Sequence, residues 1–229
     1  MAQTTQAAEA ATHYGAEYFK WQFEIGRFGG WANLGKFSSY IRPEMKVVDF
    51  GCGCGYLLAN VQCKEKLGVE INPVARAEAE KSGIRALAST SALEDDWADV
   101  IISNHALEHC RHPLQELQAL LPKVVSGGLV VFVVPCESIK NKYRADDPNH
   151  HLYSWSAMSL ANLFAEAGFQ VIECKPYIHT WPPRFLPRLL RTLGGRGLFD
   201  AGCRIYGALT SWNLTPSHFS QIRVVARRK

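Results

Sequence analysis

The chain has 229 residues, of which 47% are hydrophobic and 20% are charged, a balance typical of one globular domain with a full core. This composition excludes a disordered or fibrous chain. The longest purely apolar run, residues 129–134, is far shorter than the ~20 residues that cross a bilayer, and residues 1–5 lack the charged and apolar regions expected of a signal peptide. Seven irregularly spaced cysteines favour a reducing compartment. We therefore expect a soluble, cytoplasmic protein with a single domain, residues 1–229.

The formal net charge of +4 is unevenly distributed. Residues 1–174 carry 15 basic against 20 acidic side chains, whereas residues 175–229 carry 10 basic side chains and only one acidic side chain, Asp200. The last quarter of the chain is therefore strongly basic, and the rest is mildly acidic.

Residues 5–41 are predicted to be helical, because apolar side chains recur at near-helical spacing until Gly29 and Gly30 interrupt the pattern. We interpret residues 1–44 as a helical cap. From Met45 onward, short apolar runs alternate with helix-like segments, which is typical of βαβ units and a parallel sheet. The predicted strands are residues 46–50, 67–71, 84–88, 100–103, 129–134 and 169–174, and the predicted helices are residues 56–61, 73–81, 113–121 and 155–167.

Residues 176–217 break this rhythm with prolines and glycines, and we interpret them as an insertion that separates the core, residues 45–175, from a final strand within residues 218–229. A basic amphipathic helix is predicted to begin near Pro187. Aromatic and basic side chains alternate in the insertion, at Trp181, Phe185, Phe199, Tyr206 and Trp212 and at Arg184, Arg188, Arg191, Arg196 and Arg204.

The most informative segment is a glycine-rich loop, residues 51–55, which follows an apolar strand and leads into a helix. Its glycines let the backbone pass close to a ligand, and the helix N-terminus offers free N–H groups. A phosphate-binding P-loop is excluded because no Gly-Lys-Ser/Thr follows. The dinucleotide fingerprint G-x-G-x-x-G/A fails as well, at Tyr56 and at Leu58. The remaining pattern is acid-x-Gly-x-Gly-x-Gly, which begins at Asp49.

Two carboxylates accompany this loop. Asp49 would repel a pyrophosphate, but it suits a ligand that carries positive charge. Glu70 ends the second predicted strand, 19 residues after Gly51, where a carboxylate can accept hydrogen bonds from both hydroxyls of a ribose. An adenosine with a cationic tail fits all of these features.

In these segments the sequence resembles the class I S-adenosylmethionine-dependent methyltransferases. The matching segments are residues 47–55, 68–73, 99–109 and 126–134, and they occur in the family's order. The resemblance implies an α/β, Rossmann-like fold, with a seven-stranded, mostly parallel sheet of order 3-2-1-4-5-7-6 and helices on both faces.

The resemblance also implies contacts with S-adenosylmethionine. Glu70 would bind the ribose, Ile71 would lie against the adenine, and the adjacent Asn72 would be a further cofactor-binding residue. After the third strand the family usually has an acidic residue for the adenine amino group, whereas this chain has Ser89 and Ser91 there. The residues implied near the methionine portion are Asp49, Gly51, Cys52, Gly53 and Gly55.

Candidate chemistry follows the fourth predicted strand, because ligands in open α/β sheets lie at the carboxyl ends of the strands. Asn104 and His105 can shape the cofactor pocket there. His105 is also a candidate general base, since histidine can take a proton from an acceptor hydroxyl at neutral pH. His109 is interpreted as packing against, or capping, a short helix.

Residues 105–109 also match the H-x-x-E-H pattern of zinc hydrolases. That pattern requires a long helix, whereas this segment follows a strand directly and soon meets Pro113. A divalent metal on Glu108 and His109 has no further support in the sequence, and we expect no metal.

A second polar cluster, residues 146–155, lies between the fifth predicted strand and the next helix. In methyltransferases this loop commonly faces the acceptor, so the resemblance makes His150 or His151 the candidate base. The alternative is an ordinary loop at a helix N-terminus, capped by Ser154 or Ser156.

The sequence thus predicts an enzyme that methylates an oxygen or nitrogen of a small-molecule or lipid- or glycan-linked acceptor; the alternative is a non-catalytic cofactor-binding partner in a membrane-associated assembly. No oligomeric state is implied.

For the basic insertion four interpretations stay open. They are docking of residues 181–206 on the inner face of the membrane, recognition of an anionic acceptor, nucleic-acid binding, which no accompanying motif supports, and a lid or dimer contact.

Overall fold

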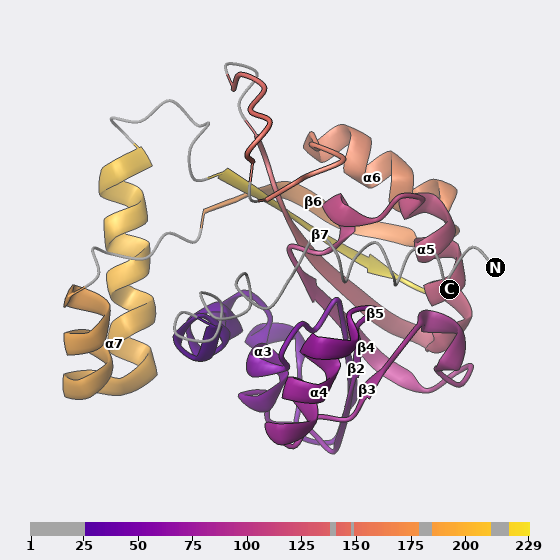
Figure 1. The fold of residues 1–229 in the computed structure, drawn as a ribbon, viewed down its shortest axis with the longest axis horizontal. Helices are drawn as coiled ribbons and strands as arrows, with labels where there is room; N and C mark the ends of the chain where they lie inside the picture. Colours follow the sequence, from indigo (N-terminus) through magenta and orange to yellow (C-terminus); the bar gives the residue numbers. More distant parts are fainter. Residues whose placement is uncertain (1–25, 138–140, 148, 179–184, 212–219) are drawn as a thin grey trace.

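The structure, a computed structural model, describes residues 26–137, 141–147, 149–178, 185–211 and 220–229. Seven strands form one sheet of order β3-β2-β1-β4-β5-β7-β6, and β7 alone runs antiparallel to its neighbours. This is the predicted order (Figure 1). The strands are β1 (Lys46–Phe50), β2 (Glu65–Val69), β3 (Ala86–Leu87), β4 (Ala98–Asn104), β5 (Val124–Pro135), β6 (Gln170–Ile178) and β7 (Ser220–Arg227).

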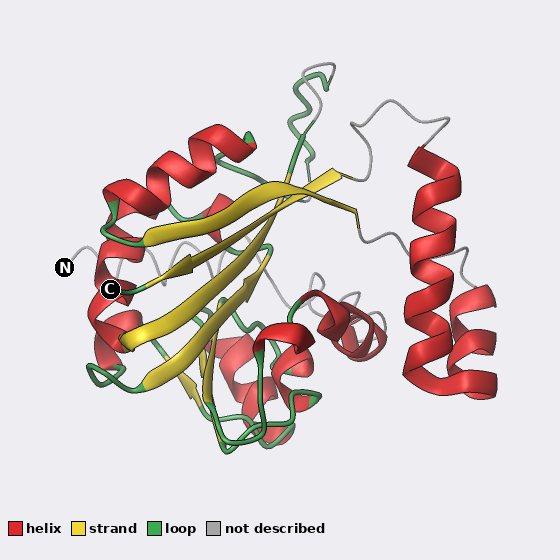
Figure 2. Ribbon diagram, turned by 180° about the vertical axis from the view of Figure 1, so that it is seen from behind, coloured by secondary structure: helices red, strands yellow, loops and turns green. Residues whose placement is uncertain are grey.

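Helices cover both faces of the sheet (Figure 2). Residues 26–33 are helical. The other α-helices are α3 (Tyr56–Ala59), α4 (Pro73–Lys81), α5 (Pro113–Leu120), α6 (Ala157–Glu166) and α7 (Phe185–Ser211). Single 3-10 turns are η1 (Leu34–Lys36), η2 (Ser38–Tyr40), η3 (Thr90–Ala92), η4 (Leu107–His109) and η5 (Leu121–Lys123).

The apolar runs of the sequence form strands that are buried on both faces. Along β5, Val130 and Phe132 belong to the cluster that contains the core residues of α5 and α6, whereas Val131 and Val133 belong to the cluster of α3 and α4. Successive side chains of a strand point to opposite faces, so a continuous valine-rich run fills both layers. This packing fixes the carboxyl ends of β1, β2, β4 and β5 at one edge, where the candidate site lies.

The glycine pair of the cap does not end its helix, contrary to the prediction. Residues 26–33 are helical through Gly29 and Gly30. A Cβ at Gly30 would lie 2.3 Å from the Tyr56 carbonyl group, so the glycine allows the cap helix to lie directly on the start of α3. The earlier part of the predicted helix, residues 5–25, lies outside the described residues.

The basic insertion contains the predicted helix, and α7 consists of two helical segments joined at Gly195, which has φ 61° and ψ −149°. The pair stands beside the sheet, next to the cap helix (Figures 1 and 2). Phe199 is fully buried against Phe28 and Trp31 of the cap. The Arg196 guanidinium lies 5.3 Å from the centre of the Trp31 ring. The insertion therefore docks on the cap.

Three residues singled out in the insertion, Trp181, Arg184 and Trp212, lie outside the described residues. Within the described part of the chain, no helix has both the length and the apolar character needed to span a membrane.

Candidate active site

The glycine-rich loop connects β1 to α3 and is tied to the end of β2. The N–H groups of Gly51 and Cys52 donate to the Val69 carbonyl oxygen at 2.8 and 3.1 Å. Gly51 and Gly53 have φ of 72° and 53°, in the left-handed region that favours glycine. A Cβ at Gly51 would lie 2.2 Å from the Ala106 Cβ, whereas one at Gly53 would meet no described atom within 4 Å. The loop therefore packs tightly against Ala106 at Gly51, whereas at Gly53 it leaves space beside the backbone.

The Glu70 carboxylate holds this loop against the start of α4. Its Oε2 accepts from the Gly53 N–H at 2.9 Å, and its Oε1 accepts from the Asn72 N–H at 2.8 Å. Burial raises the pKa of Glu70, although these two N–H groups act in the opposite direction. Each carboxylate oxygen can accept a second hydrogen bond, so Glu70 can still receive ribose hydroxyls.

Asp49 lies at the end of β1 and is 2% exposed. Burial, and then the charge of Glu70, raise the pKa of Asp49 well above its usual value. A buried carboxyl group beside a half-buried one attracts a cationic ligand strongly, because positive charge relieves both their mutual repulsion and their desolvation.

The other residues predicted to bind the cofactor are each held by different contacts. Asn72 is buried, and its Oδ1 accepts from the first N–H groups of α4. Cys52 is buried, and a Cβ on Gly68 would lie 2.3 Å from its Sγ, so the thiol packs against β2. Ser89 Oγ and Ser91 Oγ lie 2.7 Å apart after β3.

Ile71 is half-buried beside Glu70, and sequence reasoning missed the residue that fixes this segment. The Arg76 guanidinium donates to the Glu70 and Ile71 carbonyl oxygens, both at 2.8 Å. An arginine in the first turns of a surface helix gives no sequence signal for this role.

A lysine that the sequence did not single out reaches the end of β4. Lys36, at the end of η1, is 2% exposed, and its Nζ donates to Asn104 Oδ1 at 2.7 Å. Burial lowers the pKa of Lys36 to about 7, while the charge of Glu108 raises it. Because a lone lysine in a short polar stretch normally faces solvent, no local pattern pointed to it.

His105 follows β4 with a φ of 56°, and its N–H donates to the Val133 carbonyl oxygen at 2.9 Å. A side chain other than glycine is uncommon in this region, and such strain is typical of functional sites. Burial, and then the charge of Lys36, lower the pKa of His105 to about 3, so the imidazole is neutral. Its Nδ1 lies 3.6 Å from Glu108 Oε1.

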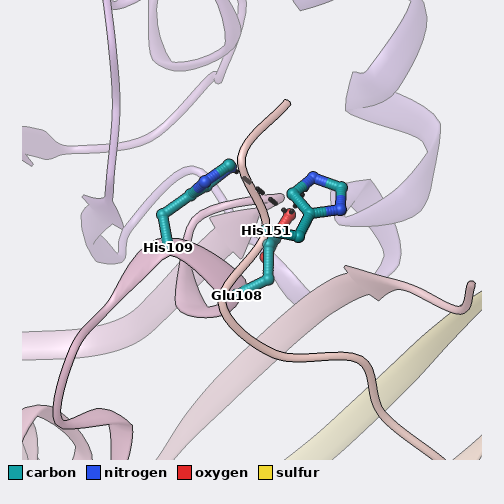
Figure 3. A group of neighbouring side chains, drawn as sticks. All are labelled: Glu108, His109 and His151. Atoms are coloured by element: carbon teal, nitrogen blue, oxygen red, sulfur yellow. Dashed lines mark ion pairs between the residues drawn. The ribbon is translucent and has the colours of Figure 1, made fainter. Parts of the chain in front are cut away.

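Glu108 is the centre of a cluster that also contains His109 and His151 (Figure 3). Its side chain is fully buried, and neither carboxylate oxygen has a hydrogen-bond partner among the described residues. The Nε2 atoms of His109 and His151 each lie 3.9 Å from Glu108 Oε1, and the two rings meet edge to face at 5.0 Å. Burial raises the pKa of Glu108 to about 8 and lowers that of His109 to about 4.

Backbone contacts bring His151 to this cluster from a distant loop. The N–H groups of Leu152 and Tyr153 donate to the Glu108 carbonyl oxygen at 3.0 and 3.3 Å. His151 Nδ1 lies 2.6 Å from Glu137 Oε1, just after β5. His150, in contrast, is exposed, and its N–H donates to Asp147 Oδ2. The structure thus gathers His105, His109 and His151 around Glu108.

Comparison with known proteins places this site in a family. Residues 23–174 match the model of a methyltransferase domain. No curated protein matches the sequence. An S-adenosylmethionine-dependent methyltransferase from Archaeoglobus fulgidus has a similar structure, with a TM-score of 0.64 and 18% identity over 92% of this chain and 99% of that one.

Two further solved structures share the fold. An S-adenosylmethionine-dependent methyltransferase from Mesorhizobium loti matches with a TM-score of 0.57 and 15% identity, over 88% of this chain and 100% of that one. Phosphoethanolamine N-methyltransferase 2 of Haemonchus contortus, in complex with S-adenosylmethionine, matches with a TM-score of 0.56 and 14% identity, over 86% of this chain and 52% of that one.

The methyltransferase model covers more than half of the chain, and it contains both the glycine-rich loop and the Glu108 cluster. The sheet order and the carboxylates of the loop agree with that match. The chain therefore belongs to the methyltransferase domain family.

Proposed function

We propose that this enzyme moves the methyl group of S-adenosylmethionine to an oxygen or nitrogen of a small-molecule or lipid- or glycan-linked acceptor. The observation that carries the proposal is the polar cluster around Glu108, directly beside the cofactor loop. A Cβ at Gly51 would touch Ala106, which lies two residues before Glu108. Groups able to accept a proton thus border the place where the methyl group is presented.

Each end of the cofactor has its own residues in this proposal. The glycine-rich loop and Asp49 hold the methionine portion, and Glu70 accepts hydrogen bonds from the ribose. Ile71 and the Ser89–Ser91 turn line the adenine, and Asn104 and His105 border the transferable methyl. Bound S-adenosylmethionine supplies an electrophilic methyl group on a sulfonium, and the ionised Asp49 carboxylate favours that positive charge over the neutral product.

The acceptor must lose a proton in the course of the transfer. Its lone pair attacks the methyl carbon in line, the C–S bond breaks, and the sulfur keeps the electron pair as a neutral thioether. His151 can take the proton, because Glu137 beside Nδ1 holds the ring with Nε2 toward the cluster. His105 and His150 are the other candidate bases.

The insertion gives the acceptor side of the enzyme a second surface. On α7 the side chains of Leu193, Ile205 and Leu209 are 71%, 62% and 66% exposed, in a region of the sequence rich in arginine. Within the bounds of α7 the sequence has four arginines against one acidic residue, Asp200. Exposed apolar residues with excess positive charge suit the surface of an anionic membrane. Each basic residue near such a surface contributes about 1 kcal/mol of binding free energy. A lipid-linked acceptor would be presented there.

Methyl transfer is tested with isotope-labelled S-adenosylmethionine and pooled acceptors, together with calorimetry of the demethylated cofactor. We expect His151→Ala to lose at least 100-fold in turnover, on the scale of general-base catalysis, with unchanged cofactor affinity. His112→Ala removes an exposed histidine outside the cluster and serves as the control. Unchanged turnover in variants at positions 105, 150 and 151 would eliminate a histidine base.

Membrane contact is tested separately by co-sedimentation with vesicles at low salt. Binding to vesicles with phosphatidylglycerol but not to neutral vesicles is expected, with loss of binding in the Leu193→Glu, Ile205→Glu double variant. Met158→Glu is the matched control, because Met158 is an equally exposed apolar residue on α6. Absence of binding to anionic vesicles, or equal binding to a nucleic acid of the same charge, would refute a membrane-specific surface.

A further inference from the structure

We propose that Glu108, His109 and His151 bind a divalent transition-metal ion, and that this ion holds a hydroxyl oxygen of the acceptor beside the transferable methyl group. The role of the ion in holding the acceptor rests on the proposed function, whereas the metal site itself is argued from the three side chains alone. This assignment departs from the sequence-based expectation of no metal.

The geometry of the three side chains is close to that of a bound site. One ligand atom from each residue lies within 4.8 Å of the other two, and each Nε2 is 3.9 Å from Glu108 Oε1. Around a metal with bonds of about 2.1 Å, neighbouring ligand atoms are about 3.0 to 3.4 Å apart. The two separations of 3.9 Å would have to shorten by about 0.5 to 0.9 Å, and the widest separation, which is at most 4.8 Å, by no more than about 1.8 Å to complete the coordination. Figure 3 shows the two rings on either side of the carboxylate.

The burial of Glu108 is the independent reason to expect an ion. The carboxyl group is fully buried with no hydrogen-bond partner among the described residues, and leaving such a group unpaired costs about 1 to 3 kcal/mol. The buried Lys36, which feels the charge of Glu108, donates its hydrogen bond to Asn104 instead. A metal ion between Glu108 and the two imidazoles would satisfy the carboxylate.

The surroundings also orient the ligands as a metal site requires. Glu137 Oε1 lies 2.6 Å from His151 Nδ1, so a proton on Nδ1 leaves Nε2 with its lone pair toward Glu108. A carboxylate behind a ligating histidine is the usual support of such a site. The N–H groups of Leu152 and Tyr153 anchor the His151 loop on the Glu108 carbonyl oxygen.

The donor set selects the class of metal. Two imidazole nitrogens and one carboxylate oxygen suit Mn²⁺, Fe²⁺, Co²⁺ or Zn²⁺, whereas Ca²⁺ and Mg²⁺ prefer oxygen ligands alone. Three protein ligands leave open coordination positions, as in catalytic rather than structural sites. These positions suit an acceptor that offers two adjacent oxygens, such as a vicinal diol or a catechol.

The ion would prepare the acceptor for methyl transfer. Coordination lowers the pKa of a bound hydroxyl, which releases its proton to water. The oxygen lone pair then forms the O–CH3 bond while the C–S bond breaks and its electron pair stays on sulfur. In this arrangement His151 is a ligand and not the base.

The metal site is tested on the full chain after treatment with EDTA. Titration with Co²⁺, followed by visible absorption, and calorimetry with Mn²⁺ and Zn²⁺ should show one tight site per chain. Glu108→Gln, His109→Ala and His151→Ala should each weaken metal affinity by on the order of 100-fold, while His112→Ala leaves it unchanged. Binding of the demethylated cofactor and thermal melting report whether each variant is folded.

The outcomes separate the two halves. No stoichiometric transition-metal binding by the wild-type chain, or full affinity in the Glu108→Gln variant, would overturn the site. If His151→Ala fails to fold, the Co²⁺ spectrum of the wild type and of His151→Gln decides instead. Metal binding with EDTA-resistant methylation of a diol acceptor would overturn the acceptor half. Metal binding without methylation of any acceptor would contradict the proposed function and leave the site standing.

Discussion

Lys36 Nζ donates a hydrogen bond to Asn104 Oδ1 at 2.7 Å and so joins the N-terminal cap to the end of β4 across 68 positions of the chain. The lysine is almost fully buried, and no carboxylate lies within ion-pair distance of it in the described ranges. Burial lowers the pKa of Lys36 to about 7. The burial of Lys36 therefore makes the stability of the protein depend on the protonation of this side chain.

Lys36→Met is expected to remove that dependence. The unfolded chain keeps the proton up to about pH 10.5, whereas the folded chain releases it near pH 7, so unfolding takes up a proton between these values. The free energy of unfolding of the wild type should rise by a few kcal/mol through this window because of Lys36. Urea denaturation in EDTA at several pH values measures the difference between the two proteins, and parallel curves would contradict the prediction.

Asp49→Asn should trade cofactor affinity for stability. The pKa of Asp49 is raised well above its usual value, so the ionised form destabilises the folded state, and this cost appears as the pH rises past about 4. The amide avoids the cost, and the unfolding free energy at pH 7 should increase by on the order of 1 kcal/mol. Affinity for S-adenosylmethionine should fall at least tenfold, because the carboxylate no longer balances the cation. Calorimetry measures the cofactor affinity and urea denaturation the unfolding free energy of the same samples. A decrease in both quantities would contradict the prediction.

Much of this site was predictable because its signals are local in the sequence. Asp49 and Glu70 lie at fixed offsets from the glycines, and the alternation of apolar runs predicted βαβ units and a parallel sheet, whose strand order the family resemblance implied. Lys36 was missed, since its role depends on a partner 68 residues away. The cap helix was predicted to break at Gly30, because a glycine that permits close packing on Tyr56 has the same sequence signal as one that ends a helix.

Gly53→Ala should mainly lower cofactor affinity, whereas Gly51→Ala should mainly lower stability. A Cβ at Gly53 meets no described atom within 4 Å, so Ala there should cost about 1 to 2 kcal/mol for its positive φ and still fold. Its methyl group would point into the open side of the loop, and we expect cofactor affinity to fall at least tenfold. Ala at Gly51 would collide with Ala106, at 2.2 Å, and should mainly lower the melting temperature. Thermal melting with and without cofactor distinguishes the two effects; wild-type affinity in the Gly53 variant would contradict the assignment.

The Glu108 cluster illustrates what spacing alone cannot reveal. The H-x-x-E-H pattern placed Glu108 and His109 together, but the third member comes from a loop 42 residues later. Hydrogen bonds from Leu152 and Tyr153 to the Glu108 carbonyl oxygen create that juxtaposition, and every residue type except proline supplies such N–H groups. The sequence named His151 only as a candidate base.

Glu137→Gln tests whether the Glu137 carboxylate orients the His151 ring for metal binding. The carboxylate keeps the proton of His151 on Nδ1, whereas an amide can also donate to Nδ1 and move the proton to Nε2, which then cannot bind a metal. Transition-metal affinity should fall by about 10- to 100-fold, with cofactor affinity and melting temperature unchanged. Asp146→Asn is the matched control, because that exposed carboxylate pairs with Arg144 in the neighbouring loop. Equal metal affinity in the wild type and in Glu137→Gln would show that the pair does not orient the ring for a metal.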